Sequence, residues 1–196
     1  CDVMPLRNIN RIIAIYVFKD LKKFDIYLFN RILKIKDIHR KININDFGYL
    51  VGPILNSAGR LGDANKVVKL LTTNNLKIKD NIINKIVEIN EKRKKLEDIS
   101  INDINFNIIK KINDDVLVIY ENLLNEGIIG IIAARIKEYF NKPSIVLTKT
   151  NNVYKASARS TSNFNIGKFI KKAIDKQIIL NGGGHNLAAG FSIKKA

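Results

Sequence analysis

The chain has 196 residues, with 34 Lys or Arg against 18 Asp or Glu, a formal net charge of +16 and a pI near 9.9. An apolar content of 46% supports a packed core and indicates a globular protein with one domain and an accessory segment, or two small domains. The positive charge favours a polyanionic partner such as a nucleic acid without locating its groove, because Lys, Ile and Asn are abundant throughout.

The single cysteine, Cys1, excludes an internal disulfide framework and a cysteine-based zinc site, and it suits a reducing compartment. No apolar run approaches the roughly 20 residues of a membrane span, and the first residues lack the order of a signal peptide. We therefore expect a cytoplasmic protein without a membrane partner. Because the chain does not begin with Met, we interpret it as a fragment of a longer protein.

The first half of the chain has the apolar periodicity of helices. Helices are predicted over residues 8–21 and 26–33, after Asp63 and from Asp80 onward, with a connector over 34–45. Asn8 is the predicted cap of the first helix, whose apolar face includes Ile9, Ile12 and Tyr16. In the long helix, the charged residues between 88 and 97 are predicted to form a solvated face rather than a nucleic-acid site.

Residues 46–62 read DFGYLVGPILNSAGRLG, a dense motif of small residues inside an apolar helical segment. The glycines imply close backbone approach. Asn56 and Arg60 are four residues apart and share one face of a helix. A surface salt bridge is the usual role of one arginine, but the position of Arg60 between two glycines favours a binding role.

The second half has the pattern of an α/β domain. A continuous apolar strand over 116–120, a helix over 127–140 and a strand over 144–148 predict a right-handed βαβ unit. The other predicted elements are strands over 153–160 and 189–193 and a helix over 166–174. We therefore predict an α/β fold, with a helical region over 1–113 and a small mixed sheet flanked by helices over 114–196.

The glycine-rich stretch 181–190, NGGGHNLAAG, is predicted to be a tight turn whose bare backbone lies close to another group. The stretch 155–160, KASARS, supplies the hydroxyls and the guanidinium of Ser157, Arg159 and Ser160. Hydroxyls, a guanidinium and free backbone amides are the groups that hold a phosphate. An ordinary structural turn is the alternative interpretation of the glycine run.

Together these motifs resemble the middle and C-terminal part of RecJ-type single-stranded-DNA-specific exonucleases of the DHH phosphoesterase superfamily, including their DHHA1 domain. The resemblance covers nearly the whole chain. It rests on five stretches in the family's order: DVMPL with Asn10 and Arg11, Gly52 to Gly62, Asn90 to Lys94 with Leu96, Gly127 to Arg135, and Ser157 to Ser160 with Gly183, Gly184 and His185.

The resemblance implies the substrate-binding part of a 5′→3′ exonuclease in DNA repair and recombination. Its first long helix would connect a catalytic DHH domain to the domain in this chain, and single-stranded DNA with a 5′ phosphate would lie in the groove between those two domains. Arg60, Ser157 and Arg159 match positions that grip this phosphate. The implied substrate-binding residues are Asn56, Arg60, Ser157, Arg159, Ser160, Gly183, Gly184 and His185. A single-strand-binding protein or a helicase is the implied protein partner.

The chain also departs from the superfamily. It has no Asp-His-His triplet, and His39 and His185 are its only histidines. The resemblance therefore assigns the catalytic residues and the divalent metal, Mn²⁺ or Mg²⁺, to a DHH domain outside this chain, so that the chain alone is expected to be inactive. Asn125 stands where the family usually has a histidine, and an amide cannot titrate near neutral pH. The OB-like domain of fuller members is also absent.

Two alternatives remain open from the sequence. One is a DHH-family phosphodiesterase of short oligonucleotides or cyclic dinucleotides, which shares the glycine-histidine motif but lacks the Gly52-to-Gly62 segment. The other is a non-catalytic nucleic-acid-binding DHHA1 module like the appendage of alanyl-tRNA synthetases. Binding to single strands of different length and to tRNA distinguishes the three.

Overall fold

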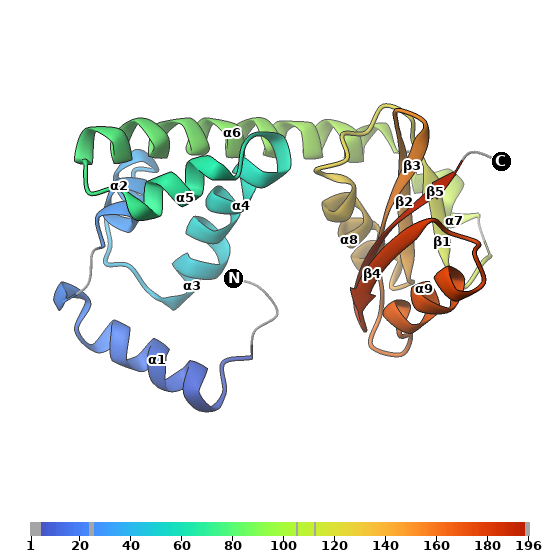
Figure 1. Cartoon of the computed structure of the whole chain (residues 1–196), viewed down its shortest axis with the longest axis horizontal. Coiled ribbons are helices and arrows are strands. Elements are labelled where there is room, and N and C mark those ends of the chain that lie inside the picture. Colours follow the sequence, from blue (N-terminus) through green and yellow to red (C-terminus); the bar gives the residue numbers. More distant parts are fainter. Residues whose placement is uncertain (1–4, 24–25, 105, 112, 195–196) are drawn as a thin grey trace. The chain divides into compact units, whose positions relative to one another are not determined.

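A computed structural model describes residues 5–23, 26–104, 106–111 and 113–194, in two compact units (Figure 1). The helical unit is residues 1–93 and the sheet unit is residues 94–196. The units divide inside one long helix, whereas the change of sequence pattern stands at residue 114. A helical region followed by a mixed sheet with flanking helices confirms the predicted α/β class. The domain boundary between residues 113 and 114 stays a prediction.

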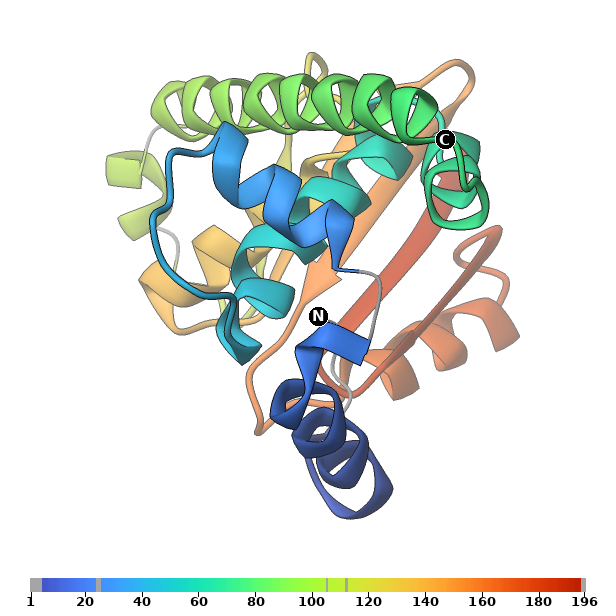
Figure 2. The ribbon, with the colours of Figure 1, turned by 90° about the vertical axis from the view of Figure 1, so that its left-hand side faces the viewer.

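The helical unit contains α1 (Asn8–Lys19), η1 (Leu21–Lys23), α2 (Tyr27–Ile35), α3 (Ile44–Asp46), the π-helical turn η2 (Phe47–Val51), α4 (Gly52–Leu61), α5 (Asn65–Thr72) and the first part of α6 (Leu76–Asp103). Its core joins α2, α4 and α5 to one side of α6, as Figure 2 shows for α2 and α4. Ile32, Ile54 and Ile83 are fully or almost fully buried there. Helix α6 begins four residues before the predicted start, because the Asn75 side chain accepts the Ile78 N–H and caps it.

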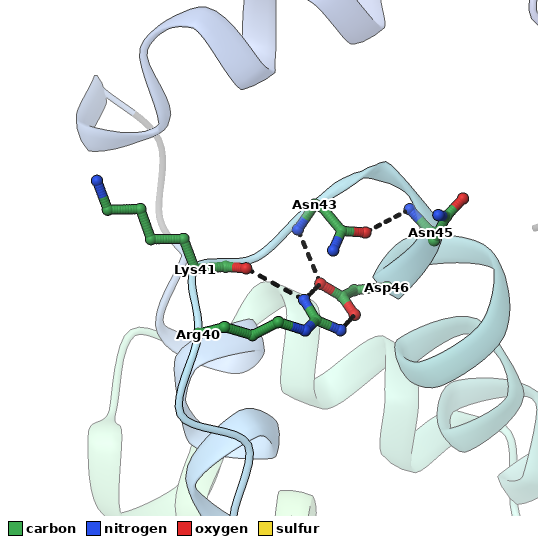
Figure 3. A network of polar contacts seen from close by, with 5 residues as sticks. All are labelled: Arg40, Lys41, Asn43, Asn45 and Asp46. Carbon is green, nitrogen blue, oxygen red and sulfur yellow. Dashed lines mark hydrogen bonds and ion pairs between the residues drawn. The ribbon is translucent and has the colours of Figure 1, made fainter.

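The predicted connector before α3 is held by a polar network (Figure 3). Arg40 donates two hydrogen bonds to the buried carboxylate of Asp46, from Nη1 to Oδ2 at 2.8 Å and from Nη2 to Oδ1 at 2.7 Å. The Asn43 N–H also donates to Asp46, and the Asn43 side chain accepts the Asn45 N–H. The network therefore fixes the chain immediately before η2, the turn that leads into the helix carrying Asn56 and Arg60.

We expect Asp46→Asn to lower the free energy of unfolding by about 1.5–3 kcal/mol near neutral pH, the contribution typical of hydrogen bonds to a charged group. The hydrogen bonds from Arg40 lower the pKa of Asp46; burial opposes them and the Asn43 N–H reinforces them. Because the folded pKa is the lower one, the stabilisation is present above the unfolded pKa of about 4. It is lost as pH falls through the folded pKa.

Urea unfolding followed by circular dichroism, from neutral pH into acid, tests the prediction. The free energies of unfolding of the wild type and of Asp46→Asn should converge in acid. Asp37→Asn is the matched control, because Asp37 is exposed. Within the described residues, its ion pair is with His39, which is also exposed. Such a surface pair contributes little. Equal losses in the two variants would contradict a specific role for Asp46.

Helix α1 differs from its prediction. Arg7 occupies the N-cap position, so Asn8 lies inside the helix instead of capping it. Ile9, Ile12 and Tyr16 are 67%, 66% and 63% exposed, and α1 buries no side chain in the described structure. The apolar period correctly indicates a helix, but a period does not specify what the apolar face contacts. The preceding Asp2-Val3-Met4 stretch lies outside the described residues.

The sheet unit contains the end of α6, α7 (Phe106–Lys110), β1 (Leu117–Tyr120), α8 (Ile129–Phe140), β2 (Ser144–Thr150), β3 (Val153–Arg159), α9 (Ile166–Asp175), β4 (Asn181–His185) and β5 (Ala188–Lys194). The strand order is β1-β2-β3-β5-β4. Strands β1 and β2 are parallel with α8 between them in sequence, which confirms a βαβ unit, while its right-handed crossover stays a prediction. The other strand pairs are antiparallel.

The two faces of this sheet differ. Helix α8 packs against β2 and β3, and α9 packs against β4 and β5. The core beneath α9 contains Ile166 and Ile170 together with Ala156, Ala189 and Phe191 from the strands. Because side chains alternate along a strand, Ser157 and Arg159 lie on the opposite face from Ala156 and Ala158. The phosphate-binding candidates on β3 are therefore on the side of α8.

Candidate phosphate-binding site

Ser157 and Arg159 meet at the beginning of α8. Arg159 Nη1 donates to Ser157 Oγ at 3.0 Å and to the Ala158 carbonyl at 2.8 Å, which orients the guanidinium. A Cβ built on Gly130, in the first turn of α8, would stand 2.9 Å from Arg159 Nη2 and 3.0 Å from Ser157 Oγ. A side chain at this position would have to displace the ends of the Arg159 and Ser157 side chains. A guanidinium, a hydroxyl and a helix N-terminus in one place suit an anion.

Asn125 stabilises the turn before α8. Its Oδ1 accepts the Gly127 N–H at 2.8 Å, and its carbonyl accepts the Ile128 N–H at 3.0 Å. The amide thus has a local structural role at the position where the resemblance expects a histidine. The side chain is exposed.

The sheet register joins the glycine-histidine motif to the same face. Ser157 is opposite Gly190, which is opposite Gly183, and we call Gly190 and Gly183 the glycine row. Directly opposite residues of antiparallel strands share one face of the sheet. Gly183 and Gly190 are exposed, and nothing lies within 4 Å of a Cβ built on Gly183. The glycine row is therefore an open strip of backbone beside Ser157.

His185 belongs to the neighbouring row, opposite Ala188, which is opposite Arg159. Two strand spacings of about 4.8 Å separate the backbones of Arg159 and His185 by about 10 Å. His185 is exposed, and its Nδ1 accepts the Leu187 N–H at 3.4 Å. With Nδ1 as the acceptor, Nε2 carries the proton of the neutral ring and is the nitrogen that can donate to a ligand.

The glycine run is an edge strand, so its prediction as a tight turn was wrong. None of its glycines has a positive φ, and the turn follows at Asn186 and Leu187. Close approach, which was also predicted, does occur. A Cβ on Gly182 would meet Phe191, and one on Gly184 would meet Ala188 and Ala189. Gly184 therefore faces the α9 core, on the opposite side from Gly183.

Ser160 fastens the β4–β5 turn to the rest of the unit. It is buried, its N–H donates to the Leu187 carbonyl at 2.9 Å, and its Oγ donates to the Phe164 carbonyl at 2.6 Å. The Asn165 side chain, which caps α9, also donates to Asn186 Oδ1 at 2.6 Å. These contacts hold the β4–β5 turn, which directly follows His185, near the end of β3.

Asn56 and Arg60 lie on α4 in the helical unit. Both are exposed, whereas Ser57 and Ala58 between them are buried, so the expected shared face of the helix is confirmed. The structure thus gathers Ser157, Arg159, Gly183 and His185 on one sheet face and Asn56 with Arg60 on one helix face. The proposal that both groups grip the same ligand stays a prediction.

Helix α6 carries buried polar side chains that the sequence did not predict. Asn90, Arg93 and Glu97 are buried, although residues 88–97 were predicted to form a solvated face. Arg93 Nε donates to Asn90 Oδ1, and Glu97 Oε1 accepts from Arg135 Nε of α8 at 3.2 Å. The signal was present, because positions 90, 93 and 97 continue the helical spacing of the apolar face. The Glu97–Arg135 pair connects α6 to the helix whose first turn adjoins Arg159.

The described residues include no group of three or more His, Cys, Asp or Glu side chains that could hold a metal ion. Within that part of the chain, the side chains do not fit the divalent metal that the family resemblance implies. No described helix combines the length and apolarity that a membrane crossing requires.

The chain is similar to known proteins. Residues 113–196 match the DHHA1 domain family. The chain is 27% identical over 199 residues to the single-stranded-DNA-specific exonuclease RecJ of Bacillus subtilis, an alignment covering 98% of this chain and 25% of that protein. It is 28% identical over 207 residues to RecJ of Haemophilus influenzae, covering 99% of this chain and 36% of the relative.

Among solved structures, RecJ of Thermus thermophilus in complex with Mg²⁺ is similar to this chain with a TM-score of 0.81 and 22% identity. The alignment covers 98% of this chain and 30% of that structure's chain. The likeness shows that the fold is shared. This chain spans only about a quarter to a third of the length of these curated relatives.

Proposed function

We propose that this chain is the substrate-binding part of a 5′→3′ single-stranded-DNA exonuclease. The proposal starts from the match of residues 113–196 to the DHHA1 domain family and from the similarity of the chain to the RecJ exonucleases. Its biological role would be DNA repair and recombination in the cytoplasm. The observation that carries the proposal is the Ser157–Arg159 pair at the start of α8, bordered by the open glycine row.

The proposed ligand is a strand that begins with a 5′ phosphate. A terminal phosphate carries more charge than an internal diester, so Arg159 and the Ser157 hydroxyl, joined by Arg60, would favour a strand end over a continuous strand. The glycine row would let the sugar-phosphate backbone approach the sheet without meeting side chains. Holding the first phosphate sets the register of the strand, and cleavage polarity would follow from that register.

Hydrolysis itself is assigned to a DHH domain with divalent metal ions, because the described residues of this chain do not fit a metal site. The chain alone would therefore bind DNA without cutting it. Its side chains would bind the terminal phosphate, orient the strand and keep the scissile end in place. A single-strand-binding protein or a helicase is the proposed protein partner.

Fluorescence anisotropy at fixed salt concentration tests the ligand. We expect the tightest binding to a labelled single strand of several nucleotides with a 5′ phosphate, and weaker binding to the 5′-hydroxyl strand, a dinucleotide, a duplex and tRNA. Tightest binding to a dinucleotide would instead support a small-substrate phosphodiesterase, and tightest binding to tRNA a non-catalytic module. The salt concentration is held constant because every polyanion binds this basic chain more weakly as salt rises.

A further inference from the structure

Tyr49 is the most exposed aromatic residue in the part of the chain that the structure describes. Its side chain is 86% exposed. Among the described residues, the Tyr49 side chain makes no hydrogen bond and no ring contact. A tyrosine ring this free of neighbours contributes little to the core of the helical unit, so its role has to be sought at the surface.

The turn that carries Tyr49 is nevertheless firmly held. Tyr49 lies in the π-helical turn η2, and turns of this kind are frequent at functional sites. Phe47, two residues earlier, packs against Phe29 with ring centroids 4.3 Å apart and against Phe18 at 5.2 Å. Val51, two residues later, is buried. The backbone beneath Tyr49 is thus anchored on both sides while its ring stands in solvent.

Tyr49 continues the exposed face of α4. Moving along the chain from Tyr49, the accessible positions are the partly buried Pro53 and then Asn56 and Arg60, at spacings of four, three and four residues. Val51 and Ile54 are buried on the other side. Spacings of three and four place residues on one side of a helix. Tyr49 and Arg60 are therefore about 16 Å apart along one exposed face, at a rise of about 1.5 Å per residue.

The arrangement has the two components that bind single strands. A cation engages the backbone, and an aromatic face accepts an unpaired base without preference for its identity. Resting on the proposed function, we propose that Tyr49 stacks on a nucleobase of the strand whose terminal phosphate Arg60 helps to hold. The stacked base belongs to a nucleotide downstream of the first phosphate. Tyr49 thereby adds affinity for strands longer than a dinucleotide.

The experiment uses the 196-residue chain and 5′-phosphorylated single strands that carry 2-aminopurine at one position in turn. Stacking quenches this fluorescent base. With wild-type protein we expect quenching at one or two downstream positions. Tyr49→Ala should abolish this quenching and weaken binding about tenfold, equivalent to about 1.4 kcal/mol, whereas Tyr49→Phe should keep both. Tyr16→Ala, an exposed tyrosine on α1 in the same unit, is the matched control and should behave as wild type.

A strand with an abasic site at the quenched position separates stacking from a structural effect. Tyr49→Ala should not weaken binding to that strand further. An equal loss on the intact and abasic strands overturns the stacking role. Normal binding and quenching by Tyr49→Ala, alongside weakened binding by Arg159→Ala, also overturns it and leaves the proposed function standing. A wild-type chain that binds none of these strands overturns the proposed function and the stacking role together.

Discussion

We expect Gly184→Ala to destabilise the sheet unit by about 1–3 kcal/mol or more, the usual cost of forcing extra volume into a packed site. A Cβ on Gly184 would meet the Ala188 carbonyl oxygen and stand 2.5 Å from Ala189 Cβ. Both neighbours belong to β5, which is paired on its other side with β3. Because these atoms are backbone or buried in the core, they cannot move aside as the end of a flexible side chain would.

Gly183→Ala is the matched control, one residue away on the same strand. Its Cβ would meet nothing within 4 Å. Since alanine loses less backbone entropy on folding than glycine, this variant should be neutral or slightly more stable. Urea unfolding followed by circular dichroism measures both. Similar losses in the two variants would contradict the assignment of Gly184 to the core face and Gly183 to the open face.

Arg159→Ala is expected to weaken binding to a 5′-phosphorylated single strand by about 1–3 kcal/mol, or about 5-fold to 150-fold, since it removes a charge-assisted hydrogen-bond donor. Binding to the 5′-hydroxyl strand should weaken less, because the terminal phosphate is the group that Arg159 is proposed to recognise. The guanidinium is already oriented by Ser157 and Ala158, so little ordering is needed when the ligand arrives. Anisotropy titrations with the two strands give the difference directly.

Two further variants test whether Arg159 acts through the position of its guanidinium or only through its positive charge. Gly130→Ala keeps Arg159 but adds a methyl group 2.9 Å from its Nη2, and it should weaken binding to the phosphorylated strand in the same direction. Lys172→Ala removes an exposed positive charge from α9, which packs on β4 and β5, and should have little effect. If Arg159→Ala weakens binding to the two strands equally, Arg159 is a general phosphate contact. If Lys172→Ala weakens binding as much as Arg159→Ala does, the effect of Arg159 is that of the overall positive charge.

The elements that the sequence predicted well are those with local signals. The apolar run 116–120, the helix ended before Pro143 and the strand 144–148 appear as β1, α8 and β2. The glycine run was wrongly predicted as a turn, because glycine has no strand propensity. Its extended conformation follows from pairing with β5. The charged stretch of α6 is not wholly solvated as its charge predicts, because Asn90, Arg93 and Glu97 continue the buried face of the helix.

By itself, the sequence determined the helical and α/β halves, the residue types that suit a phosphate and the positive charge that favours a polyanion. It could do so because helix periods, strand runs and side-chain chemistry are properties of neighbouring residues. Only the tertiary structure decided that Ser157 shares a face with Gly183 and not with Gly184, that Gly130 adjoins Arg159, and that Ile9, Ile12 and Tyr16 of α1 are exposed. These facts depend on strand register and on contacts between distant segments, and a shift of one residue would reverse every face assignment without changing any local pattern.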